Sequence, residues 1–176
     1  MKTRFAAPIA SAATAVLLLG ACSDDDATSG DDGTTSSVDG PTTLAMGEDL
    51  GFVGGAPGLS DQTMDITAEE EDGEVTGQAS FTPSKLILDL QCADTSTDGL
   101  VLLAGQAAER AETVAQPGEW VVVVIREGDP DRVGLWFQGE DDIGSCEEAL
   151  VAVPATDTDA DSSSLAEVTD GDIETG

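Results

Sequence analysis

The chain has 176 residues, with 36 acidic against 6 basic side chains, and it contains three cysteines but no histidine. This length is typical of a single domain, and the lack of histidine excludes a Ser-His-Asp triad, a histidine general base and an imidazole-ligated zinc site. A formal net charge of -30 also excludes nucleic acid as a partner, because phosphate backbones are bound by clustered Lys and Arg.

The first 21 residues have the pattern of an export signal. Lys2 and Arg4 form a basic start, and residues 6–19 form an apolar run that is shorter than the about 20 residues a membrane-crossing helix needs. Small residues at positions 20 and 21 directly precede Cys22. We therefore expect residues 1–21 to be a signal peptide that is removed on export.

The end of this leader resembles the lipobox of bacterial lipoproteins, in which a cysteine follows small residues. In that family the cysteine thiol receives a diacylglyceryl group and the new amino terminus is often acylated, with chains such as palmitate. The resemblance implies that Cys22 is lipidated and holds the protein at the extracytoplasmic face of the cell membrane. Two acyl chains give lasting attachment, whereas one is marginal. The alternative is an ordinary leader, which would leave Cys22 as a free thiol.

Residues 22–61 are predicted to form a disordered acidic tether. They consist mainly of Ser, Thr, Asp and Gly, with too few large apolar side chains to offset the entropy of ordering. An apolar patch from Leu50 to Leu59 is the exception, and its glycine and proline content favours an irregular loop. Residues 154–176 are again acidic and are predicted to form a disordered tail.

Residues 62–153 show the period of two that is typical of strands. A hairpin is predicted around a turn at residues 70–73, and further strands are predicted over 86–92 and 100–104. Residues 120–125 are apolar at every position, which predicts a strand covered on both faces, and residues 133–137 form the next strand. The sequence therefore predicts an antiparallel all-β sandwich or partly open barrel of about six strands.

Two segments carry helical signals. Residues 106–114 have high helix propensity, although a strand continuing from Leu103 is favoured because the neighbouring elements are strands. Ser145 and Glu148 match a capping box, which predicts a short C-terminal helix that begins at Cys146.

Cys92 and Cys146 are the cysteines that remain when Cys22 carries lipid. Because an exported chain meets an oxidising environment, we expect these two to form a disulfide. It would close a loop of about 55 residues and stabilise the fold by about 4 kcal/mol on the chain-entropy model. A redox-active pair is the alternative, but the spacing lacks the C-x-x-C geometry that lowers a thiol pKa.

Two acidic segments match parts of metal sites. Residues 157–161 have the acids of the first half of a calcium loop, but Ser162 stands where that loop needs glycine and Val168 where it needs glutamate. Residues 127–131 and 140–142 could gather carboxylates around a divalent ion, although Gly-Asp-Pro-Asp is also an ordinary type I turn sequence. We expect no metal and no cofactor.

Four features occur together in residues 75–137: a V-x-G-x-A-x-F strand, a strand ending in Cys92, an apolar strand after Asp98-Gly99, and an apolar strand that runs into an acidic turn. This combination resembles a loosely defined class of secreted or lipid-anchored proteins of high-GC Gram-positive bacteria. Glu127 is a small departure from that pattern. The resemblance implies an antiparallel all-β fold and an envelope location, and it transfers no catalytic residue.

These features together predict a membrane-anchored cell-surface lipoprotein. Its domain is expected to be non-catalytic, either a binding module for a small ligand or an accessory factor that contacts an envelope protein. A carboxylate-dependent hydrolase is the alternative, and it would require two acids with raised pKa values in a cleft. A further alternative treats the acid-rich surface as an adaptation to high salt.

Overall fold

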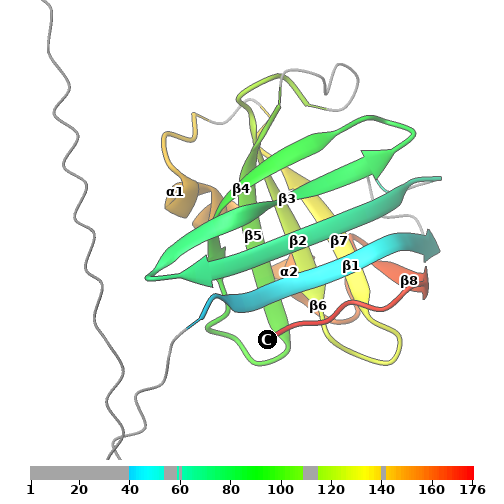
Figure 1. Ribbon diagram of the computed structural model, residues 1–176. Helices are drawn as coiled ribbons and strands as arrows, with labels where there is room; N and C mark the ends of the chain where they lie inside the picture. The colour runs from blue at the N-terminus through cyan, green and yellow to red at the C-terminus, as the bar shows by residue number, and fades with distance from the viewer. Residues whose placement is uncertain (1–39, 54–58, 60, 109–114, 140–141) are drawn as a thin grey trace, which may run out of the picture. The chain divides into compact units, whose positions relative to one another are not determined.

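The computed structural model describes residues 40–53, 59, 61–108, 115–139 and 142–176 (Figure 1). Within these residues, eight antiparallel strands form one sheet that closes into a barrel, with each strand beside the next along the chain and β8 beside β1. The strands are β1 (Thr42–Val53), β2 (Thr63–Glu71), β3 (Glu74–Thr82), β4 (Ile87–Asp94), β5 (Leu100–Ala107), β6 (Trp120–Arg126), β7 (Arg132–Phe137) and β8 (Ala166–Asp170). The all-β class is confirmed, but the barrel is closed and has more strands than predicted.

Strands β1 and β8 lie in the segments that were predicted to be a disordered tether (22–61) and a disordered tail (154–176). They pair with each other at Phe52↔Val168 and Val53↔Glu167, and this pairing closes the barrel. The prediction of disorder is therefore wrong for these residues, and the domain extends on both sides of the predicted segment 62–153. The physical reason is that each strand turns only one face inward, so a few apolar side chains suffice to order it.

The apolar patch from Leu50 to Leu59 is also not the irregular loop predicted for it, as far as it is described. Its first part belongs to β1, and Leu50 is fully buried. Leu59 is buried as well. Residues 54–58 and 60 lie outside the described residues, as do the predicted signal peptide, Cys22 and residues 23–39.

The predicted hairpin is formed by β2 and β3, which pair without interruption from Thr63↔Thr82 to Glu71↔Glu74. Asp72 and Gly73 connect them with φ values of 55° and 81°, as a two-residue type I′ turn requires. Gly77 of the V-x-G-x-A-x-F strand is needed for a different reason. A Cβ atom there would lie 2.0 Å from the carbonyl oxygen of Thr67 on the paired strand.

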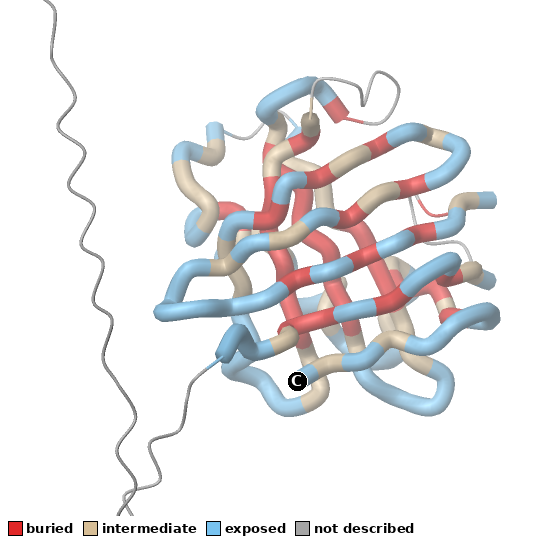
Figure 2. Tube along the Cα trace, in the orientation of Figure 1, coloured by how far each residue is buried: buried red, intermediate tan, exposed pale blue. Residues whose placement is uncertain are grey.

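Apolar side chains from all eight strands fill the barrel interior. Figure 2 shows the buried residues recurring along the strands. Small eight-stranded barrels are commonly filled in this way, since their lumen is only wide enough for side chains. Among the largest fully buried side chains are those of Phe81, Met64, Ile66, Leu88, Leu103, Val121, Val123 and Ile125.

A second apolar cluster lies on the outer face of β5 and β6, where a short helix covers the barrel (Figure 1). Helix α1 (Cys146–Ala152) contributes Ala149 to this cluster, and α2 (Ala155–Thr158) follows it. The prediction that residues 120–125 form a strand covered on both faces is confirmed. The outer cluster consists of Leu102, Ala104, Trp120, Val122, Val124, Ala149 and Leu165.

Helix α1 begins where the capping box predicts. The Ser145 side-chain oxygen accepts a hydrogen bond from the Glu148 backbone N–H at 3.2 Å. The Glu148 carboxylate accepts from the Gly144 N–H at 2.8 Å, one residue before the position that a standard capping box uses. For the ambiguous segment 106–114, β5 continues as a strand through Ala107, and residues 109–114 lie outside the described residues.

Candidate functional site

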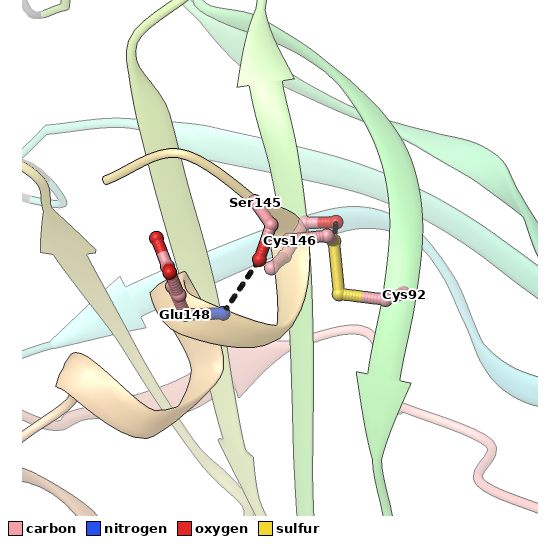
Figure 3. Close-up of a disulfide and its surroundings, with 5 residues drawn as sticks. Cys92, Ser145, Cys146 and Glu148 are labelled. Carbon is pink, nitrogen blue, oxygen red and sulfur yellow. Dashed lines mark hydrogen bonds between the residues drawn. A yellow bond between two sulfur atoms is a disulfide. The ribbon is translucent and has the colours of Figure 1, made fainter.

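Cys92 and Cys146 form the expected disulfide, which joins β4 to the first residue of α1 (Figure 3). Their Cα atoms are 6.0 Å apart. The bond fastens α1 over the outer apolar cluster, where Cys92 and Cys146 themselves pack. Two of the three cysteines of the chain are thereby paired with each other.

The two acidic segments considered for metal binding form local hydrogen bonds where the structure describes them, and residues 140 and 141 lie outside the described residues. Asp157 lies in α2, and its carboxylate accepts a hydrogen bond from the Ser164 hydroxyl at 2.8 Å. The Asp131 carboxylate accepts from the Gly128 N–H at 2.9 Å and so closes the β6–β7 turn. The Asp129–Pro130 peptide bond in this turn is cis. In the part of the chain that the structure describes, no cluster of three or more Asp, Glu, Cys or His residues is placed to hold a metal ion.

A hollow of about 220 Å³ lies beside this same turn, where β6 ends and β7 begins. Two guanidinium groups and three carboxylates line it, although basic residues are rare in this chain. The lining residues are Arg126, Glu127, Gly128, Asp129, Pro130, Arg132, Ala160 and Asp161.

The strand register places the two arginines next to each other. Arg126 is directly opposite Arg132 in the β6–β7 ladder, so both side chains emerge on the same face of the sheet. Their neighbours Ile125 and Val133 are buried in the barrel interior, and alternation along each strand therefore directs the arginines outward. Like charges directly opposite each other destabilise a sheet.

The two guanidinium groups have different surroundings. Arg132 forms an ion pair with Glu167 at 2.9 Å and donates a hydrogen bond to the Ala160 carbonyl oxygen at 2.6 Å. It thus holds the segment around Ala160 against the barrel. Arg126 makes no hydrogen bond or ion pair with any described residue, and it is partly exposed. Its five N–H donors therefore remain available for a ligand.

The arginines belong to a row of side chains that crosses the outer face of the barrel. Cross-strand pairing links Leu100 to Arg126, Arg126 to Arg132, Arg132 to Glu167, and Glu167 to Val53. Val53, at one end of the row, is 57% exposed. The hollow is therefore flanked by apolar side chains within one continuous row.

Neither arginine was among the site residues predicted from the sequence. A usable signal was present, since only four basic residues follow Cys22 and two of them, Arg126 and Arg132, bracket the predicted turn 127–131. Their direct juxtaposition, however, depends on the register of β6 against β7.

Asp94, the last residue of β4, lies away from the hollow. Hydrogen bonds from the Ser96 side chain and from its backbone N–H, the latter at 2.8 Å, lower the pKa of Asp94 below its usual value. A lowered pKa suits a carboxylate that stabilises a turn. A general acid of a hydrolase needs a raised one.

Within the described residues, neither helix is long and apolar enough to cross a membrane. Comparison with known proteins found no matching family model, no matching curated protein and no matching solved structure.

Proposed function

We propose that the chain is an exported lipoprotein, anchored through Cys22 to the extracytoplasmic face of the cell membrane, whose barrel is a non-catalytic binding module. The proposal combines the leader sequence with the chemistry of the three cysteines and with the filled interior of the barrel.

The observation that carries the proposal is the pairing of Cys92 with Cys146. Structural disulfides persist in exported proteins and are rare in reducing compartments, so the bond supports export. It also removes two of three cysteines from other chemistry. The remaining one, Cys22, is the cysteine that follows the small residues at the end of the leader.

The shape of the domain supports binding over catalysis. Side chains fill the lumen, so a substrate has no place inside the barrel. The Arg126–Arg132 hollow on the outer wall holds an unpaired guanidinium, which is a binding group. The alternative hydrolase would need paired carboxylates that differ in pKa.

The anchor is tested by mass spectrometry and detergent phase partitioning of the protein expressed with its leader. The wild type should begin at Cys22, carry acyl chains and enter the detergent phase. Cys22→Ala should lose the acyl mass and either appear in the aqueous phase or keep its leader. Ser23→Ala changes the neighbouring residue but leaves the thiol, so it should behave as the wild type.

A wild-type protein with an unmodified Cys22 would refute the anchor. Equal partitioning of the wild type and Cys22→Ala after leader removal would refute it as well.

A further inference from the structure

We propose that the Arg126–Arg132 hollow binds a small zwitterion of amino-acid size, with its carboxylate on Arg126 and its ammonium group on Asp129 and Asp161. This inference rests on the proposed binding role and names the ligand class for that role.

Positive charge is concentrated in this hollow. The described residues include three basic side chains, Lys85, Arg126 and Arg132, and two of them line this one hollow. The pair lies directly opposite in a sheet, an arrangement that costs stability when both side chains are cationic. A carboxylate bound at Arg126 offsets this repulsion.

The two arginines have different roles in the hollow. Arg132 is already engaged by Glu167 and by the Ala160 carbonyl oxygen, and it positions the wall of the hollow that carries Asp161. Arg126 has no partner among the described residues, and its planar fork of donors matches a carboxylate. Arg126 is therefore the ligand-binding residue and Arg132 a positioning residue.

The carboxylates of the hollow indicate that the ligand also carries a positive charge. Glu127, Asp129 and Asp161 line the hollow together with the arginines. Glu127 is hydrogen-bonded by the Thr175 hydroxyl, whereas the side chains of Asp129 and Asp161 have no hydrogen-bond partner within the described part of the chain. These acids repel a simple anion and the arginines repel a simple cation, so a ligand that carries both charges fits best.

The volume of the hollow limits the size of the ligand. A volume of about 220 Å³ is below the 300–1,000 Å³ that is usual for sites of drug-sized ligands. A free amino acid, or the zwitterionic end of a larger molecule that projects out of the hollow, matches this volume.

The probe for the test is L-alanine, titrated into the ¹⁵N-labelled full chain while backbone amide shifts are recorded. Saturable shifts are expected at Gly128, Ala160 and their neighbours in the hollow. Acetate and methylammonium, which each carry one of the two charges, should bind more weakly than L-alanine.

Two variants of Arg126 and a charge-matched control test the guanidinium. Arg126→Gln should weaken L-alanine by about tenfold or more, and Arg126→Lys by less, because it keeps the charge but loses the planar fork. Lys85→Gln makes the same change in net charge in the β3–β4 connection, at the barrel end where β6 begins rather than ends. It should leave the affinity unchanged.

Asp161→Asn distinguishes a zwitterion from an anion. Removing this carboxylate should weaken L-alanine, which loses a partner for its ammonium group, and should strengthen acetate, which loses a repelling charge. A single variant thus moves the two probes in opposite directions.

The inference is overturned if L-alanine gives no saturable shifts, if acetate binds as tightly as L-alanine, or if Lys85→Gln weakens binding as much as Arg126→Gln. Failure to bind L-alanine by a protein that is still lipidated at Cys22 would refute the ligand class alone. Loss of lipidation would refute the proposed function instead.

Discussion

Strands β1 to β4 bury one face each, whereas β5 and β6 bury both faces. In β2 the burial alternates strictly between exposed and buried residues over Thr63–Ala68, so this open wall (β1–β4) relies on the barrel interior alone. In the covered wall (β5–β7), every residue of β6 from Trp120 to Ile125 is buried. Helix α1 covers the outer face of the covered wall, and the disulfide joins α1 to β4.

The difference shows how a short acidic chain builds two kinds of surface. The open wall presents its acids directly to water, as at Glu71 and Glu74. The covered wall presents a second apolar layer and, at its end, the arginine hollow. We therefore expect perturbations of the covered wall to have large effects on stability and perturbations of the open wall to have small ones.

Removing the disulfide should have the largest effect. The double variant Cys92→Ala/Cys146→Ala should lower the free energy of unfolding by about 4 kcal/mol, because it frees a loop of 54 residue steps in the unfolded chain. Urea denaturation measures the loss, and dithiothreitol treatment of the wild type should reproduce it. A double variant as stable as the oxidised wild type would show that α1 stays over the covered wall without the bond.

The outer apolar layer can be tested with two valines that differ in burial. Val122, on the outer face of β6, is 0% exposed, so Val122→Ala should cost about 2 to 3 kcal/mol through lost burial and the cavity left behind. Val151, on α1, is 86% exposed, and Val151→Ala should change stability by less than about 0.5 kcal/mol. Equal costs in urea denaturation would mean that α1 does not cover this face in solution.

Charge repulsion on the open wall should give a smaller effect. Glu71 is directly opposite Glu74 at the end of the β2–β3 hairpin, so Glu71→Gln should stabilise the fold by a few tenths of a kcal/mol at low salt. In 1 M NaCl the Debye length falls to about 3 Å and the gain should vanish. The same titration tests the high-salt interpretation, which a wild type that folds only in molar salt would favour and salt-independent stability would contradict.

What the sequence could predict was local. The hairpin turn at Asp72-Gly73, the cap at Ser145 and the doubly apolar strand at residues 120–125 each result from a few adjacent residues, and the structure confirms all three. The disulfide was also predictable, because the predicted lipidation of Cys22 leaves one pairing.

Closure of the barrel and assembly of the hollow depend instead on residues far apart in the chain. Strand β1 pairs with β2 along most of its length and also with β8, more than a hundred residues later, and the composition of neither segment reveals the β1–β8 pairing. The arginine hollow depends on the β6–β7 register and on Ala160, which Arg132 brings to the barrel. Only the coincidence of two rare arginines around one turn was visible beforehand.

The smallest effect on stability is expected where β4 of the open wall connects to β5 of the covered wall. Asp94 ends β4, and its pKa is lowered by the hydrogen bonds from Ser96. A carboxyl group with a lowered pKa in the folded state stabilises the fold above its ordinary pKa, near 3.8, and loses this contribution as the pH falls through the folded value. Stability measured between pH 6 and pH 2 should therefore fall less steeply in Asp94→Asn than in the wild type. Because Asp94 is exposed, the difference should be small. Identical pH profiles for Asp94→Asn and the wild type would mean that the Ser96 hydrogen bonds do not persist in solution and that this connection is not fixed by them.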